Sequence, residues 1–458
     1  MKVPLTPPTL SELLGELVKE GTSKLTEVVG SDLGKQPEGR YVHWDELRHL
    51  PLSHGFTHRQ WWLAIKMARR ANHPLPFADT KRTSFTYAVP DNVLKLIHEI
   101  DRDASGRIEV PELVTSSQTR DRYLVNSLIE ESITSSQLEG AATTHKVAKE
   151  MLRQGRKPRN HGEQMIYNNY AAMQFIRTHK HLPLTPSLIL ELQSIMTDLT
   201  LEDPSATGRW RRPDEDVRVV DERNHEVLYV PPPADQVDAR IAELCSFGNG
   251  AHENPFIHPV IKALTIHFMM GWIHPFVDGN GRTARALFYW AMAKSGYWLI
   301  EFISISRIIK KAPAQYARAY LHTETDDNDL TYFIEHQLNV ICAAIKALHT
   351  YLANKSKEIA DTRRLIASSP KLKDKLNHRQ LAVMDHLMKQ SHAIYRIQEH
   401  QNALQVTYQT ARTDLLNLVE LGLLEKHRDG KAFVFQMSKK IRTKLAGKSA
   451  ANVHEADT

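Results

Sequence analysis

A glycine-rich loop between two helical segments constrains the fold most. Gly279-Asn280-Gly281 follows an apolar stretch, residues 259–272, and precedes residues 281–294, and both stretches have helical spacing. Gly279-x-Gly281-x-x-Ala284 also fits a dinucleotide-binding fingerprint, but that fold needs a buried strand before the loop. The chain contains no Gly-x4-Gly-Lys-Ser/Thr loop, which excludes a P-loop enzyme. The sequence therefore predicts a mainly α fold in which an anion binds at a helix N-terminus.

The residues around this loop form a set suited to phosphoryl transfer. His274 has a side chain whose pKa suits proton abstraction near neutral pH, and Asp278 is a hard oxygen ligand for Mg²⁺. The backbone at residues 279–281 can approach an anion closely, and Arg282 and Arg285 lie three apart on the next helix. A capping Asp with solvated arginines is the structural alternative, which the complete set within twelve residues disfavours.

The segment resembles the Fic-domain family, whose motif is His-Pro-Phe-x-Asp/Glu-Gly-Asn-Gly-Arg-x-x-Arg. Residues 274–285 match every defined position, and the resemblance extends upstream to residue 217 and downstream to about residue 320. It implies a helical bundle that transfers AMP from Mg·ATP to a Ser, Thr or Tyr hydroxyl of a target protein and of itself. The ATP-binding residues that it implies are Asp278, Gly279, Asn280, Gly281, Arg282, Thr283, Arg285 and Tyr316.

The same resemblance implies individual roles. His274 is expected to deprotonate the target hydroxyl, Asp278 to hold Mg²⁺, and Arg285 to hold the γ-phosphate. Tyr316 matches a family position near the adenine, where many members have a second Tyr next and this chain has Ala317. His267, seven residues before His274, is expected to pack beside the loop.

An inhibitory motif is expected far upstream, on a helical stretch over residues 117–155. Ser135, Glu139 and Gly140 match the family pattern Ser/Thr-x-x-x-Glu-Gly/Asn, although alone they indicate only a helix end with a glycine stop. The resemblance implies that Glu139 pairs with Arg285 and so misplaces the phosphates of ATP. In some relatives this Glu is thought to support removal of AMP, and that second activity stays open here.

Residues 217–230 alternate around a polar turn, which predicts a β-hairpin. In the family, this position is a flap that holds the target segment by strand addition. The docking residues expected from it are Val217, Val219, Val220 and Tyr229.

The last folded segment, residues 376–438, reads as three helices followed by a hairpin turning at Asp429-Gly430. It resembles a winged helix-turn-helix, and the basic residues Arg412, Lys426, His427, Arg428 and Lys431 fit DNA binding. Winged helices also serve as dimer or partner contacts, and we expect a homodimer.

The remaining expectations concern organisation. We predict an extended arm over 1–40, a small helical domain over 41–115, the Fic domain with its inhibitory helix over 116–350, a linker over 351–375 and a disordered tail over 439–458. Two cysteines among 458 residues, a formal charge of +6, and no visible signal peptide or apolar run of about 18 residues indicate a cytoplasmic protein without membrane contact.

Two alternatives stay open. The chain could be a transcription regulator that uses the Fic core as a nucleotide sensor, or a Fic enzyme with another nucleotide donor. The intact base His274 favours the enzyme. Residues 101–112 also fit the EF-hand calcium pattern, although Pro111 interrupts it and a polar turn is the simpler interpretation.

Overall fold

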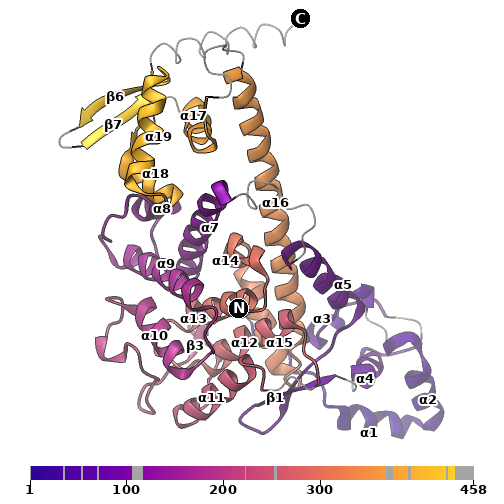
Figure 1. Ribbon diagram of the computed structural model, residues 1–458. Helices are drawn as coiled ribbons and strands as arrows, with labels where there is room; N and C mark the ends of the chain where they lie inside the picture. Colours follow the sequence, from indigo (N-terminus) through magenta and orange to yellow (C-terminus); the bar gives the residue numbers. More distant parts are fainter. Residues whose placement is uncertain are drawn as a thin grey trace, which may run out of the picture. The chain divides into compact units, whose positions relative to one another are not determined.

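The computed structural model describes residues 2–34, 37–52, 55–69, 72–105, 117–221, 223–251, 255–367, 375–389, 393–429 and 432–438 (Figure 1). The chain forms two compact units. Unit 1 comprises Met1–Gly106, Glu131–Ala142 and Asn160–Ala344, and unit 2 comprises Arg107–Glu130, Thr143–Arg159 and Ile345–Thr458. The fold is mainly helical, as the sequence predicted.

Two buried helices form the centre of unit 1. α12 (Pro259–Ile273) is apolar around nearly its whole circumference, and α13 (Asn280–Lys294) packs against it with most of its side chains buried. A helix that is apolar on all sides is stable only when other elements surround it. α11 (Val237–Gly248) packs on α12, while α9 (His161–His179) and α10 (Pro186–Thr197) pack on α13.

Short helices continue the bundle after α13. These are η7 (Trp298–Phe302), α14 (Ile305–Ile309), α15 (Pro313–Thr325) and the start of α16 (Thr331–Ala367). Between α10 and α11 lie η5 (Pro204–Ala206), β3 (Val219–Asp221), β4 (Glu226–Tyr229) and η6 (Ala234–Gln236). β3 and β4 pair antiparallel, which confirms the predicted hairpin.

The predicted extended arm over residues 1–40 is wrong. These residues form α1 (Leu10–Glu20), α2 (Thr22–Gly30), η1 (Asp32–Gly34) and η2 (Pro37–Gly39). A capping box between Thr9 and Glu12 starts α1, and Leu13 and Leu17 bury against Trp62 and its neighbours. The helical spacing of these leucines outweighs the Pro-rich opening, because it supplies a face that can be buried.

The next segment mixes helices and strands, where only helices were expected. It contains α3 (Trp44–Leu47), α4 (His58–Ala68), β1 (His73–Ala78), β2 (Ser84–Tyr87), α5 (Asp91–Ile100) and the π-helical turn η4 (Asp101–Ser105). β1 and β2 form an antiparallel pair.

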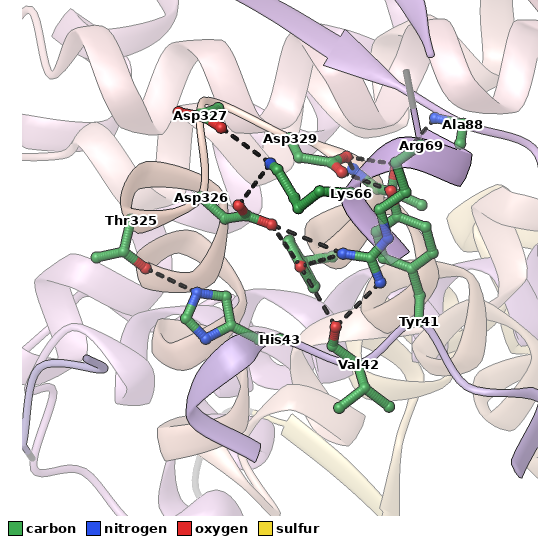
Figure 2. A network of polar contacts seen from close by, with 12 residues as sticks. Tyr41, Val42, His43, Lys66, Arg69, Ala88, Thr325, Asp326, Asp327 and Asp329 are labelled. Atoms are coloured by element: carbon green, nitrogen blue, oxygen red, sulfur yellow. Dashed lines mark hydrogen bonds and ion pairs between the residues drawn. The ribbon is translucent and has the colours of Figure 1, made fainter. Parts of the chain in front are cut away.

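A buried polar network joins this segment to the turn between α15 and α16 (Figure 2). Arg69 donates to the Tyr332 hydroxyl at 2.6 Å and to the Val42 carbonyl at 3.0 Å, and its guanidinium lies 3.6 Å from the Tyr41 ring centroid. Lys66 pairs with Asp326 at 2.8 Å. Buried charges persist only when they are paired, so the network fixes the N-terminal helices to the bundle.

Two further boundaries differ from the expectations. The stretch 117–155 is two helices, α7 (Ser117–Leu138) and α8 (His145–Gln154), because Gly140 has a φ of +90° and the backbone turns there. The expected linker over 351–375 is largely helical, since α16 continues to Ala367. The expected tail over 439–458 lies outside the described residues.

Unit 2 contains the winged helix-turn-helix, as predicted. Its helices are α17 (His378–Lys389), α18 (Ile397–Leu404) and α19 (Tyr408–Glu420), and its strands are β5 (Tyr395–Arg396), β6 (Leu424–Asp429) and β7 (Ala432–Met437). The strand order is β5-β7-β6. Leu387, Leu415, Leu418 and Phe435 lie in its core.

Residues 106–112 of the EF-hand pattern lie outside the described residues, which stop at Ser105 and resume at Ser117. The first expected ligand, Asp101, accepts a hydrogen bond from the Tyr297 hydroxyl at 2.6 Å and pairs with His258 at 3.1 Å. Among the described helices, none is long and apolar enough to cross a membrane.

We expect Arg69→Met to lower the free energy of unfolding by about 3–5 kcal/mol, because it leaves buried acceptors without their cation. Chemical denaturation followed by circular dichroism measures this loss. Arg59→Met is the matched control: Arg59 pairs with Glu16 on the surface, so its removal should cost under about 1 kcal/mol. Equal losses in the two variants would contradict a special role for the network.

Candidate active site

The conformation of His274 is set by the end of α12. His274 is the left-handed C-terminal cap of this helix, with φ 50° and ψ 56°, and its backbone N–H donates to the Met270 carbonyl at 3.2 Å. Its ring Nδ1 lies 3.1 Å from the Gly271 carbonyl oxygen. A carbonyl can only accept, so Nδ1 carries the proton, and Nε2 keeps the lone pair that a general base needs.

Burial lowers the pKa of His274 below the usual value of 6.5. The hydrogen bond to Gly271 and the nearby carboxylates of Glu139 and Asp278 oppose this shift, while the guanidinium of Arg211 adds to it. The net direction keeps the imidazole neutral at neutral pH. The residue is therefore in the protonation state in which it can accept a proton.

Asn280 fixes the loop from within. Its side-chain oxygen accepts from the Phe276 backbone N–H at 2.9 Å, and its amide nitrogen donates to the Phe276 carbonyl at 2.8 Å. Phe276 is fully buried, with Trp210 beside its ring. The side chain of Asn280 thus holds the loop in shape, and its backbone can serve the phosphate role that the sequence predicted.

Asp278 and Arg282 are paired with each other. The guanidinium of Arg282 donates to Asp278 Oδ2 at 2.8 Å and to the Met196 carbonyl at 3.0 Å, and Asp278 Oδ1 accepts from the Gly279 N–H at 2.6 Å. Arg282 is buried, whereas the Asp278 side chain is 44% exposed. An accessible carboxylate held in place by a cation fits Mg²⁺, which takes one or two carboxylates together with phosphate oxygens and water.

Arg285 is held by the segment around the end of α7. It donates to the Ser135 hydroxyl at 2.9 Å, the Ser135 carbonyl at 3.1 Å and Glu139 Oε1 at 2.8 Å. Burial alone lowers the pKa of Arg285, but Glu139 and Tyr316 raise it above its usual value, so the guanidinium stays charged. The structure thus brings together the residues of the inhibitory motif and the arginine expected to meet the γ-phosphate.

The Glu139 carboxylate lies on the first turn of α13. A methyl group placed on Gly281 would be 2.2 Å from Glu139 Oε1, so only glycine leaves room for this carboxylate. The N-cap residue, Gly279, has a φ of +87° and no side chain with which to cap the helix. A helix N-terminus attracts anions, and here the anion is supplied by the chain itself.

The residue expected near the adenine is half-buried beside these groups. The Tyr316 hydroxyl lies 2.9 Å from His267 Nε2 and 3.5 Å from the Tyr320 hydroxyl. His267 is fully buried, and its ring lies near those of Phe288 and Phe333. Tyr320 stacks on Phe268 and lies against Gly271, a contact that sequence reasoning missed.

The hairpin is fastened next to the loop by Tyr229, which the sequence assigned to target docking, and by Arg211, which the sequence did not single out. Tyr229 donates to the Trp272 carbonyl at 2.8 Å, and Arg211 donates to the His274 carbonyl at 2.8 Å and to the Pro232 carbonyl. Val219 pairs with Tyr229 and Val220 with Val227, while Val217 lies just before β3. Val220 and Val227 are exposed.

Residues 183–292 match the model of the Fic/DOC family, and residues 379–436 match that of the DeoR-like helix-turn-helix domain. The chain carries a Fic domain. The curated proteins named "Protein adenylyltransferase Fic" from Drosophila grimshawi and Drosophila virilis are 26% identical over 223 and 222 residues. Each match covers 48% of this chain and 43% of the relative, so the chain spans less than half of these proteins.

Solved Fic structures are also similar. A Fic family protein from Desulfovibrio desulfuricans is 18% identical with a TM-score of 0.49, and the match covers 77% of this chain and 98% of that one. Fic-1 from C. elegans is 19% identical with a TM-score of 0.42, and the match covers 58% and 72%.

We expect the imidazole pKa of His274 to lie below 6.5 and to fall further in Glu139→Gln, because that change removes an anion that stabilises the imidazolium. NMR titration of the imidazole resonances measures both values, and His274→Ala assigns the signal. As pH falls, a base with a lowered pKa becomes protonated later, so transfer should persist below pH 6.5. A rise in the pKa on removing Glu139 would contradict this electrostatic account.

Proposed function

We propose that this protein transfers AMP from Mg·ATP to a Ser, Thr or Tyr hydroxyl of a target protein and of itself, and that Glu139 holds the activity off. The observation that carries the proposal is the base His274, with its free Nε2, next to a helix N-terminus whose N-cap residue is Gly279 and which holds a carboxylate that a phosphate could replace. The family match and the names of the curated relatives support nucleotidyl transfer. We also propose a cytoplasmic homodimer.

The proposed reaction assigns a role to each of these groups. The target hydroxyl forms a bond to the α-phosphorus while the bond from that phosphorus to the bridging oxygen breaks, so pyrophosphate leaves. His274 Nε2 accepts the hydroxyl proton. The backbone N–H groups at the start of α13 and the guanidinium of Arg285 stabilise the negative oxygens. Asp278 would hold Mg²⁺, which neutralises charge on the phosphates.

The proposed inhibition acts through Arg285, the cation that the γ-phosphate of ATP needs. While Arg285 is paired with Glu139, the γ-phosphate lacks its guanidinium and meets a carboxylate at the first turn of α13. ATP that binds in this state has displaced phosphates. A displacement of about 1 Å from the reactive geometry can lower the rate by about 100-fold.

We expect Glu139→Gly to raise self-modification with labelled ATP by about 100-fold, because it frees both Arg285 and the helix N-terminus. His274→Ala in the same background should lower transfer by at least about 100-fold through loss of the base. Incubation with labelled ATP, UTP, GTP and CTP, followed by mass spectrometry of modified lysate proteins, measures the rate, the donor and the targets. Unchanged labelling in Glu139→Gly would refute inhibition by Glu139.

The winged helix supports a second function, DNA binding. The exposed face of α19 carries polar residues of the types that read base edges, and the wing presents Lys426, His427 and Arg428 to solvent. The residues exposed on that face are Tyr408, Gln409, Arg412, Thr413 and Asn417. The match to the DeoR-like domain supports the same interpretation, in which the Fic core reports nucleotide state to a regulator.

If the domain binds DNA, Arg412→Ala should weaken binding to a random-sequence duplex and reduce the slope of log affinity against log salt by about one. Fluorescence anisotropy at several salt concentrations measures both quantities. Arg177→Ala, which removes one cation from unit 1, is the charge-matched control. Equal binding by both variants at every salt concentration would remove DNA from the proposed partners.

A further inference from the structure

The segment that carries Glu139, which we call the brake, is buried although it is polar. Five side chains in the last turns of α7 are hydroxyl or carboxyl groups with at most 5% exposure. They are Glu131, Ser132, Thr134, Ser135 and Ser136. Buried helices are usually held by apolar side chains, so a buried polar run needs a set of hydrogen-bonding partners.

Glu131 has the largest set of such partners. Its Oε2 accepts from the Tyr289 hydroxyl at 3.0 Å, the Ser304 hydroxyl at 2.7 Å and the Ser306 N–H at 3.1 Å. Its Oε1 accepts from the Ser306 hydroxyl at 2.5 Å. Burial and the carboxylate of Glu131 raise the pKa of Tyr289 well above 10, so this hydroxyl keeps the proton that it donates.

These contacts lie on the same side of α7 as the brake. Glu131 and Ser135 are four residues apart and share one face of α7, and Glu139 follows in the turn directly after the last helical residue, Leu138. Their partners Arg285 and Tyr289 are likewise four apart on α13. Two successive turns of α13 are therefore hydrogen-bonded to this segment: Arg285 to Ser135 and Glu139, and Tyr289 to Glu131.

We propose that Glu131 is a positioning residue that holds the end of α7 against α13 and α14, and so keeps Glu139 on Arg285. The inference rests on the proposed function, because it extends the brake from one ion pair to a helix segment. Glu131 touches neither the reactive loop nor the expected nucleotide site. Its carboxylate also adds to the negative field at Arg285, and the Glu139→Gly background separates that effect from the position of Glu139.

The chemistry of the site explains why a carboxylate is needed. All four hydrogen bonds are donated to Glu131, and an ionised carboxylate is an acceptor only. A glutamine has the same shape, but it loses the charge that strengthens each bond, and its amide group introduces a donor where donors already point. The Ser306 N–H cannot turn into an acceptor. Glu131→Gln should therefore favour the released position of the segment without opening a cavity.

The test compares AMP transfer by Glu131→Gln in the wild-type chain and in the Glu139→Gly background. We expect a rise of about tenfold in the wild-type chain, since charged hydrogen bonds are lost. In the Glu139→Gly background the change should stay within about twofold, because no brake is left to displace. Tyr289→Phe removes one of the four donors to Glu131 together with the acceptor of the Ile305 N–H, and it should give a smaller rise. It covers the case in which Glu131→Gln folds poorly.

Asp329→Asn is the matched control. Asp329 is a second buried carboxylate of unit 1, and it accepts from the Tyr41 hydroxyl and from the hydroxyl and N–H of Thr331 (Figure 2). Asp329→Asn should lower the melting temperature without raising transfer. Any of three results would overturn the proposal. These are an equal rise in AMP transfer in this control, no rise in transfer in Glu131→Gln, and the same rise in transfer with and without Glu139.

Hydrogen exchange separates this proposal from the brake itself. Glu131→Gln should speed amide exchange in the peptide covering residues 131–140, and Asp329→Asn should not. If Glu139→Gly fails to raise transfer, the proposed function is wrong at the brake, but faster exchange in Glu131→Gln still supports the positioning role. Unchanged exchange there would refute it whatever the activity.

Discussion

Arg285 is a permanently charged group at a buried position, and such a group must have an anion beside it. Leaving it unpaired would cost several kcal/mol. The chain meets this requirement with Glu139 and with the hydroxyl and carbonyl oxygens of Ser135. In the proposed reaction the γ-phosphate takes the place of the carboxylate. In this proposal, Glu139 and the γ-phosphate compete for one cation, and that cation lies where α7, α13 and the loop between α12 and α13 meet.

The way in which the end of α7 is held suits a segment that must move. Each neutral hydrogen bond contributes only about 0.5–1.5 kcal/mol, because water offers similar bonds when it is broken. An apolar helix would instead expose its side chains to water at about 25 cal/mol per Å². The buried serines and threonine of α7 therefore hold the brake specifically while keeping the cost of release low. The carboxylate of Glu131 provides the charged bonds in this set.

The sequence predicted the parts of the site whose chemistry is contiguous. Residues 274–285 contain the base, the expected metal ligand and the anion-binding turn, and helical spacing alone places Arg282 and Arg285. It missed contacts between distant segments, because Arg211 on His274 and Glu131 on Tyr289 depend on how the helices pack. The extended arm predicted over residues 1–40 fails for another reason: the prolines lie before Thr9, and Leu13 and Leu17 follow them at helical spacing and are buried.

The same contacts show where the proposed switch acts. His274 is already the correct tautomer, its pKa is lowered, and the C-terminal cap of α12 fixes its ring while Glu139 is in place. Asp278 is also accessible and oriented by Arg282. Only Arg285 and the first turn of α13 are occupied by the inhibitory carboxylate. In the proposed mechanism, regulation therefore acts on where the phosphates can lie, and the base needs no rearrangement when Glu139 leaves Arg285.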